Sequence, residues 1–359
     1  MVDVPDLMAL RGKRVLVTGH TGFKGSWLCV ALNELGAEVT GFALPPDGDD
    51  SHFQLLGLAD SVNHIVGDIR DYEKLQGVFD AVKPEFVFHL AAQALVRRSY
   101  DEPKLTFDTN VAGSVNVLEA VRNTPSVRVL IYVTSDKCYL NREWEWGYRE
   151  NDELGGHDPY SASKAAAELV FSAYRDSYFI RRETLGAASV RAGNVIGGGD
   201  WAADRIVPDC IRALRDGRPT ILRSPESTRP WQHVLEPLSG YLLLAARMYE
   251  AAKKYSGAWN FGPHSSEIRT VKSLTTKIIE QWGNGGRIEI DKGAATFYEA
   301  KLLHLNCDKS HQLLHWNPHW DFDRTVVETV RWYREILEGT PALTITRRQI
   351  HDFFAERHD

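Results

Sequence analysis

Tyr160 and Lys164 lie four residues apart in the segment Tyr-Ser-Ala-Ser-Lys. On a helix this spacing puts both side chains on one face. A tyrosine with a pKa of about 10 is a poor base at neutral pH, but an ammonium group one turn away favours the phenolate and can also hold a ribose. The pair therefore predicts proton abstraction from an alcohol. Because any helix can carry these two residue types, the prediction depends on the surrounding elements.

A second pattern with chemical meaning is a glycine triplet close to the N-terminus. The glycines follow an apolar run at 13–18 and begin a helical pattern at 22–35. Glycine permits a tight turn, and its bare backbone lets a pyrophosphate approach the N-terminus of the helix. This context predicts a dinucleotide site that uses Gly19, Thr21, Gly22, Phe23, Lys24 and Gly25.

The choice of dinucleotide depends on the end of the second expected strand, where an NAD site usually carries an acid. Residues 39–44 contain no acid, but they also contain no arginine or lysine, and the missing cation favours NAD over NADP. Asp68 follows the third expected strand. Its carboxylate is either an acceptor for adenine or the N-cap of a helix over 70–82.

These motifs lie in an alternation of strand and helix patterns. Strands are expected at 13–18, 38–42, 64–66, 85–90, 128–134 and 187–191, with helices at 22–35, 71–82, 105–122 and 162–178. Repeated βαβ units predict an α/β fold, a Rossmann-type doubly wound parallel sheet over residues 1–192 that binds the dinucleotide.

Beyond residue 193 helical patterns dominate, at 206–216, 236–254, 271–282 and 323–337, followed by a short tail helix. We therefore expect residues 193–359 to form a smaller, mainly helical C-terminal lobe that binds the substrate, with some segments returning to the first domain. Such a lobe would cap the carboxyl ends of the strands, where open α/β sheets bind ligands.

Composition excludes several classes of protein. The 359 residues include 42 Lys and Arg against 48 Asp and Glu, a net charge of −6 that argues against binding to nucleic acid or to an anionic membrane. The four cysteines are far apart, which excludes a disulfide scaffold. No apolar run reaches the roughly 20 residues of a membrane span, so a cytoplasmic protein is expected. His311 and His315 have a metal-compatible spacing but no acidic partners, so no metal is expected.

Together the motifs resemble the extended short-chain dehydrogenase/reductase superfamily: TGHTGFKG at 18–25, HLAAQ at 89–93, TNVAG at 109–113, YSASK at 160–164 and RAGNVIGGGD at 191–200. The resemblance covers nearly the whole chain and implies NAD as the cofactor. It also implies a homodimer or homotetramer in which helices 105–122 and 162–178 pair across a two-fold axis. The cofactor-binding residues that it implies are Asp68, Ile69, Leu90, Ala91, Ala92, Asn110, Tyr160 and Lys164.

Two further segments resemble the nucleotide-sugar dehydratases that act on CDP-glucose: Ser135-Asp136-Lys137 and the RPWQHV stretch at 229–234. Other nucleotide-sugar dehydratases of the superfamily usually carry Thr-Asp-Glu in place of Ser135-Asp136-Lys137. The resemblance implies that Tyr160 takes the proton of the sugar 4-hydroxyl during oxidation at C4 and that Ser135 bonds the same oxygen. Asp136 then protonates the departing 6-hydroxyl, for which partial burial must raise its pKa.

Lys137 has two possible roles at C5 of the sugar. A lysine is a cation at pH 7 and accepts a proton only if burial or the nearby Lys164 lowers its pKa. Lys137 is therefore either the C5 base or a cation that stabilises the enolate while water or another group is the base.

The diphosphate of CDP-glucose needs cationic partners. Arg229 is the first candidate by resemblance, followed by Arg205 and Asn194, and the other expected substrate contacts are Gln93 and His304. Alternatives are a dehydratase for dTDP-glucose or GDP-mannose, a 4-epimerase of the same fold, and a non-catalytic NAD(P)-sensing regulator. An epimerase needs no acid at C6, and a regulator would typically lack the tyrosine or the lysine.

Overall fold

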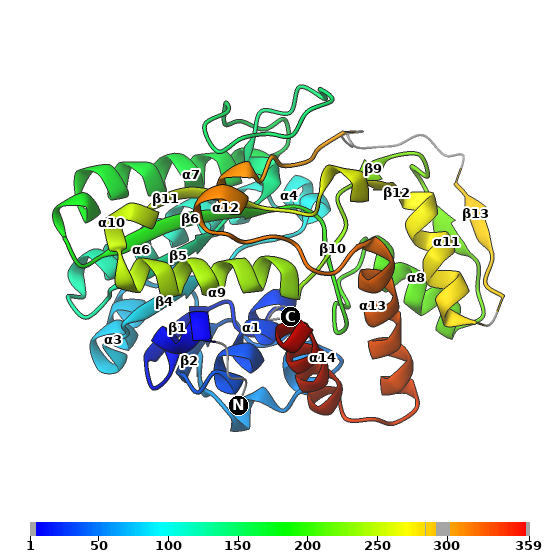
Figure 1. Cartoon of the computed structure of the whole chain (residues 1–359), viewed down its shortest axis with the longest axis horizontal. Helices are drawn as coiled ribbons and strands as arrows, with labels where there is room; N and C mark the ends of the chain where they lie inside the picture. Colours follow the sequence, from blue (N-terminus) through cyan, green and yellow to red (C-terminus); the bar gives the residue numbers. More distant parts are fainter. Residues whose placement is uncertain (1–4, 284, 292–301, 357–359) are drawn as a thin grey trace.

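The computed structural model describes residues 5–283, 285–291 and 302–356 (Figure 1). Its centre is a parallel sheet with the strand order β11-β6-β5-β4-β1-β2-β3. The strands are β1 Arg14–Thr18, β2 Glu38–Ala43, β3 Asn63–Val66, β4 Phe86–His89, β5 Val129–Val133, β6 Gly186–Ala192 and β11 Gly257–Phe261. The order reverses at β1, which pairs with β2 on one side and β4 on the other, and ligands bind beyond the strand ends at such a point. The predicted fold class is confirmed.

Helices cover both faces of the sheet (Figure 1). The helices on one face are α3 Tyr72–Val82, α6 Ser114–Asn123 and α7 Pro159–Ser177, and those on the other are α1 Phe23–Glu34, α9 Leu235–Glu250 and α14 Ala342–Glu356. Along β1, Val15 and Val17 join the core that contains α1 and α9, whereas Leu16 joins the core that contains α3 and α6. Burial on both faces explains why this strand is a continuous apolar run.

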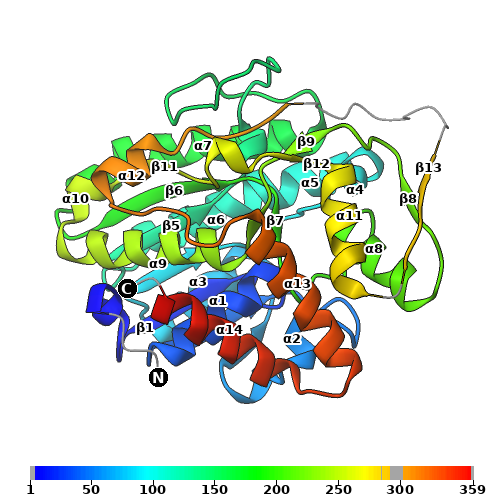
Figure 2. The same cartoon turned by 45° about the vertical axis from the view of Figure 1, so that its right-hand side comes forward.

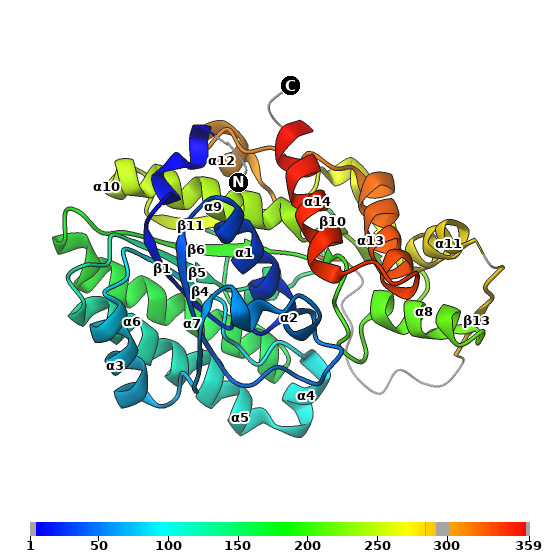
Figure 3. The same cartoon turned by 90° about the horizontal axis from the view of Figure 1, so that it is seen from below.

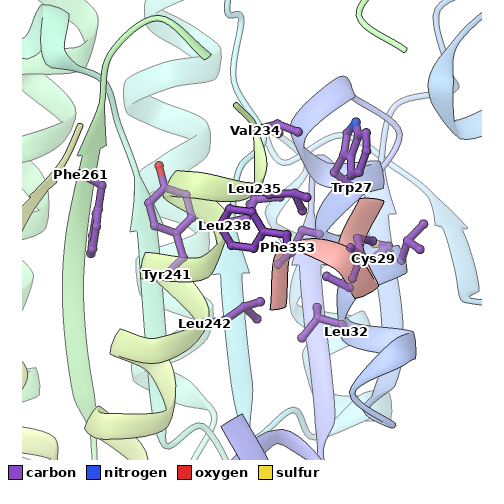
Figure 4. Packing of buried hydrophobic residues seen from close by; sticks show 14 of the residues in the cluster. Trp27, Cys29, Leu32, Val234, Leu235, Leu238, Tyr241, Leu242, Phe261 and Phe353 are labelled. Atoms are coloured by element: carbon purple, nitrogen blue, oxygen red, sulfur yellow. The ribbon is translucent and has the colours of Figure 1, made fainter. Parts of the chain in front are cut away.

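The helices of the α1 side form the larger core. Figure 4 shows α9 side chains beside residues of α1 and α14; these include Leu235, Leu238, Leu242, Trp27, Leu32 and Phe353. α14 packs across α1 (Figure 3) and has 15 residues, so the expected short tail helix is a full element of the fold. No helix in the described part of the chain is long and apolar enough to cross a bilayer.

Strand β11 was not predicted. The segment expected as one helix over 236–254 divides into α9 and α10 Ala252–Tyr255, and β11 then pairs in parallel with β6 at the edge of the sheet. Its sequence, GAWNF, contains glycine and asparagine, which are depleted in strands. The second half of the chain therefore returns to the sheet, while the division at residue 192 stays a prediction.

Two helices differ from their expected limits. The region expected as one helix over 105–122 consists of α5 Pro103–Phe107, a π-helical turn Asp108–Gly113, and α6. π-Helical turns occur frequently at functional sites. α7 begins at Pro159 rather than at residue 162, because Asp158 caps it by accepting a hydrogen bond from the Ser161 amide and proline is favourable at the first helical position. The earlier start includes Tyr160 in the first turn of the helix.

The lobe beside the strand ends contains α8 Ile206–Arg215, α11 Val271–Trp282 and α13 Phe322–Leu337 (Figure 2). Short strand pairs connect these helices. β8 Thr220–Leu222 pairs in parallel with β13 Ile288–Ile290, and β9 Thr228–Arg229 pairs antiparallel with β12 Arg269–Thr270. β9 carries Arg229.

Glu168 on α7 and Arg191 on β6 form an ion pair closed off from solvent, with exposed fractions of 1% and 3%. Arg191 donates from Nε at 2.9 Å and from Nη2 at 2.7 Å to the two carboxylate oxygens. Ser189 donates at 2.8 Å, and Thr134, the residue after β5, donates as well. Burial opposes ionisation, but Arg191 holds the pKa of Glu168 below its usual value. One carboxylate thus joins β5, β6 and α7.

We expect Glu168→Gln to destabilise the fold strongly. The substitution leaves the Arg191 guanidinium buried without its counter-charge, which costs about 3–5 kcal/mol. Urea unfolding of the purified protein measures this loss. Glu119→Gln is the matched control, because Glu119 pairs with Arg122 on partly exposed α6 and should cost less than about 1 kcal/mol. Equal losses in the two variants would contradict the importance of the buried pair.

Candidate active site

A cleft of about 1150 Å³ lies at the carboxyl ends of the strands, between the sheet and the lobe. It brings together residues from the glycine loop, from the ends of β3 to β6, and from α7 and the lobe. The predicted site residues that line it are Gly19, Thr21, Gly22, Phe23, Lys24, Gly25, Asp68, Ile69, Leu90, Ala91, Ala92, Gln93, Ser135, Asp136, Lys137, Tyr160, Lys164, Asn194, Arg205 and Arg229. Asn110 and His304 are not among its lining residues.

The glycine loop between β1 and α1 fits a dinucleotide. Gly19 has a φ of +78°, and a Cβ on Gly25 would lie 2.2 Å from the Gly19 carbonyl oxygen. Gly22 occupies the N-cap of α1 and supplies no side-chain cap. The helix therefore presents uncapped amides to the cleft, which is the arrangement that binds a pyrophosphate.

The neighbouring side of the cleft lies at the ends of β2 and β3. Thr21 donates to the Leu44 carbonyl at 3.0 Å, which connects the glycine loop to the end of β2. Asp68 binds the Arg70 guanidinium with both oxygens, and this hydrogen-bonded partner lowers the pKa of Asp68. The N-cap of α3 is Asp71, which accepts from the Lys74 amide at 3.0 Å. The alternative interpretation of Asp68 as the cap is therefore wrong.

Tyr160 and Lys164 project from the first turns of α7 into the cleft, as the spacing predicted. The Tyr160 amide donates to Ser99 Oγ at 3.2 Å, which fixes the start of the helix. Burial raises the pKa of Tyr160 to about 12 and lowers the pKa of Lys164 to about 8. These side chains alone favour the neutral phenol, contrary to the expected phenolate, because burial outweighs the Ser135 hydroxyl and the charge of Arg205, which both lower the pKa of Tyr160.

Ser135, Asp136 and Lys137 follow β5 and form the first turn after the strand. Ser135 Oγ donates to Asp136 Oδ1 at 2.9 Å and accepts from the Lys137 amide at 3.2 Å. Asp136 is 4% exposed, and burial raises its pKa despite the nearby cations Lys137 and Arg229. The raised pKa is the property that a proton donor at this position requires.

The side chains of Asn110 and Gln93 are hydrogen-bonded to other groups of the protein. Asn110 lies in the π-helical turn, accepts from the Gln93 amide at 2.8 Å, and donates to the Gln93 carbonyl and to Ser163 Oγ. Ser163 in turn donates to the Tyr160 carbonyl at 2.7 Å. The Gln93 side chain is bonded to both backbone groups of Leu95 and to Thr106. Asn110 therefore supports the Tyr160 backbone through Ser163, and the side-chain amides of Asn110 and Gln93 are used within the protein rather than presented to the cleft.

Cationic side chains line the lobe side of the cleft. Arg229 is 7% exposed and donates to the Thr228 carbonyl at 2.8 Å. Arg205 pairs with Asp200 at 3.0 Å. Asn194 lines the cleft, and its carbonyl accepts from the Gln232 amide at 3.1 Å. His304 follows the lining residue Leu303 but does not itself line the cleft, and its carbonyl accepts from the Tyr148 amide.

One group of lining residues was not found from the sequence. Arg97 on α4 Val96–Asp101 and Arg223 after β8 both bind Asp204, at 2.8 and 3.3 Å. This bridge joins the sheet side of the cleft to the lobe. No glycine or other local sequence feature predicts the positive φ of +63° at Asp204. The two arginines that bind Asp204 come from other parts of the chain. Within the described residues, no group of three or more His, Cys, Asp or Glu is arranged to hold a metal ion.

Comparisons with known proteins agree with this geometry. The model of the family described as GDP-mannose 4,6 dehydratase matches residues 16–329. CDP-glucose 4,6-dehydratase of Salmonella typhimurium is 48% identical over 349 residues, which cover 96% of this chain and 97% of that protein. UDP-glucose 4-epimerase of Mycolicibacterium smegmatis is 26% identical and covers 89% of this chain and 98% of that protein.

Solved structures show the same architecture. The epimerase Mth375 of Methanothermobacter thermautotrophicus aligns with a TM-score of 0.79 at 25% identity and covers 93% of this chain and 95% of its own. The Thermus thermophilus UDP-glucose 4-epimerase in complex with NAD aligns with a TM-score of 0.74 at 26% identity, covering 89% and 99%. The superfamily resemblance predicted from the motifs is confirmed, and the chain belongs to the GDP-mannose 4,6 dehydratase family of the extended short-chain dehydrogenases/reductases.

Proposed function

We propose that this chain is a CDP-glucose 4,6-dehydratase, which converts CDP-D-glucose to CDP-4-keto-6-deoxy-D-glucose and water. The observation that carries the proposal is the buried group of Tyr160, Ser135 and Asp136 in one cleft, in which Ser135 donates to Asp136, an acid with a raised pKa, and Tyr160 is suited to alcohol oxidation. The similarity to the Salmonella enzyme over nearly the full length supports the same substrate.

NAD is the cofactor that we assign to the glycine loop. The uncapped amides of α1 would hold its pyrophosphate, and Lys164 would hold the ribose next to the nicotinamide. When bound, NAD⁺ supplies the redox chemistry by accepting a hydride from C4 of the sugar and returning it to C6. The end of β2 supplies no cation for a 2′-phosphate, and the nearby Arg70 is already paired with Asp68.

The side chains of the cleft carry out the proton transfers. Tyr160 takes the proton of the 4-hydroxyl, and Ser135 hydrogen-bonds the same oxygen. The resulting ketone makes the C5 proton acidic. As the C5 proton is removed, Asp136 protonates the departing 6-hydroxyl. Lys137 lines the cleft directly after Asp136 and acts at C5, either as the base or as the cation that stabilises the enolate.

The lobe binds the nucleotide diphosphate in this proposal. Arg229 and Arg205 supply charge-assisted hydrogen bonds to the phosphates, and Asn194 is a neutral donor near the strand ends. Arg97 and Arg223 both bind Asp204 and add positive charge to the lining of the cleft. Neither Gln93 nor His304 contributes a side chain in the arrangement observed.

The test is mass spectrometry of the protein incubated with NAD⁺ and, separately, CDP-glucose, dTDP-glucose, UDP-glucose and GDP-mannose. We expect loss of one water from CDP-glucose alone, without accumulation of NADH. Water loss from another nucleotide sugar would identify that sugar as the substrate and leave the proposed mechanism unchanged. An unchanged mass with all four would reject dehydration and favour a 4-epimerase or a non-catalytic NAD(P)-sensing regulator.

Asp136→Asn should separate the two halves of the reaction. An amide cannot donate an acidic proton to the 6-hydroxyl, so elimination should slow by roughly 10²–10⁴-fold while oxidation at C4 continues. NADH fluorescence should then rise and persist on addition of CDP-glucose. Asp209→Asn is the matched control, because Asp209 lies at the same cleft but pairs with Arg212 in α8. Normal water release by Asp136→Asn would contradict the assigned role of Asp136.

We further propose that the protein is a cytoplasmic homodimer or homotetramer whose product feeds deoxysugars of surface polysaccharides such as lipopolysaccharide O-antigen. Exposed apolar side chains support pairing through α5 and α7, since Phe107 is 39% and Leu169 is 61% exposed in the single chain. Sedimentation of the wild-type protein should give at least twice the chain mass, and Leu169→Glu should reduce it. A wild-type monomer would contradict this assembly.

A further inference from the structure

The cleft extends beyond the catalytic side chains to the strand pair β8–β13 in the lobe. Figure 2 shows β8 and β13 at the end of the lobe far from the sheet, with β9 between them and the sheet. In the proposed function the sugar lies at Tyr160 and the diphosphate at Arg229 on β9. Because the diphosphate separates the sugar from the nucleoside, the base of the substrate would lie at β8–β13.

One face of this strand pair lines the cleft. Leu222 on β8 pairs with Ile290 on β13, and the Asp291 amide donates to the Leu222 carbonyl at 2.9 Å, which extends the ladder by one residue. Side chains alternate along a strand, so Ile221, Arg223 and Asp291 share the face opposite to Leu222. The exposed fractions agree, at 1% for Leu222 and 61% for Ile221. All three residues of the shared face line the cleft.

The shared face combines an apolar side chain, a cation and a carboxylate. Ile221 can contact the flat face of a base. At position 4 of the pyrimidine ring, cytosine carries an amino group that donates hydrogen bonds, whereas uracil and thymine carry an oxygen that accepts them. A carboxylate such as Asp291 therefore binds N4 of cytosine and opposes O4 of the other two bases. Arg223 has only donors, which match the acceptors O2 and N3 of cytosine.

The bonds that these side chains already make are compatible with a bound base. Arg223 donates to Asp204 through Nη2 at 3.3 Å, and a guanidinium has further N–H groups to offer. A carboxylate has about four lone-pair sites, so Asp291 can keep a protein partner and still accept from a base. Asp291 is exposed in the single chain, and the amino group of a bound base can approach it without displacing a buried contact.

We propose that Asp291, supported by Arg223, selects cytosine over uracil and thymine in the nucleotide of the substrate, an inference that rests on the proposed function. The two residues act on the base and not on the reacting atoms of the sugar. Asp291 is therefore a specificity-determining residue, and its effect is measured by the binding of nucleotides that carry no sugar to react.

The test is calorimetric titration of the protein, preincubated with NAD⁺, with CDP and separately with UDP. We expect the wild type to bind CDP at least about 10-fold more tightly, the scale of one well-placed base contact. In Asp291→Asn the ratio of the two dissociation constants should fall toward 1, because an amide both donates and accepts. The ratio is the deciding quantity, since loss of a negative charge changes the attraction of both diphosphates equally.

Glu289→Gln is the matched control. Glu289 precedes Asp291 by two residues, is also exposed, and is not among the lining residues of the cleft, so the same change of charge should leave the ratio unaltered. Asp291→Ser, which keeps an acceptor and a donor, replaces Asp291→Asn if that variant does not fold.

Equal affinities of the wild type for CDP and UDP would overturn the inference, and so would a ratio that Asp291→Asn leaves unchanged. Failure of the proposed function gives a different result. A wild type that prefers CDP through Asp291 but releases no water from CDP-glucose would overturn the dehydratase and keep the selection of cytosine.

Discussion

The bidentate ion pair of Glu168 and Arg191 fixes the geometry on which the cleft depends. Glu168 lies one helical turn beyond Lys164 on α7, Arg191 lies on β6, and Thr134, which precedes Ser135, donates to the same carboxylate. The network continues from Arg191 to the Tyr139 hydroxyl at 2.6 Å. A buried pair gains little net stability over apolar packing. Its value here is that β6, α7 with Tyr160 and Lys164, and the end of β5 that leads to Ser135 cannot shift independently.

The same burial sets the protonation of the site. It raises the pKa of Asp136, lowers that of Lys164 to about 8, and raises that of Tyr160 to about 12. Each change favours the neutral form, as expected where water is excluded. A neutral acid at Asp136 suits a group that must give a proton to a poor leaving group. The neutral phenol does not suit a base, so Tyr160 must lose its proton before it can take that of the 4-hydroxyl.

The parts of the site that the sequence predicted are those with local causes. The glycine triplet and the Ser-Asp-Lys turn each directly follow a strand, so the βαβ pattern places both at one edge of the sheet, and the Tyr160–Lys164 spacing requires only a helix. Features that depend on distant partners were not predicted. The amide of Gln93 is used by Leu95 and Thr106, and Asp204 binds arginines from two different parts of the chain. Strand β11 was missed because its pairing with β6, rather than its own composition, makes it a strand.

The central claim is that one cleft oxidises C4 and reduces C6 of the same sugar. The most direct measurement uses CDP-glucose with deuterium at C4 and locates the label in the product by NMR. The account predicts deuterium at C6 of the 4-keto-6-deoxy sugar, with the product one water lighter than the substrate. Deuterium lost to solvent, left in accumulated NADH, or still at C4 of an epimerised sugar would contradict it.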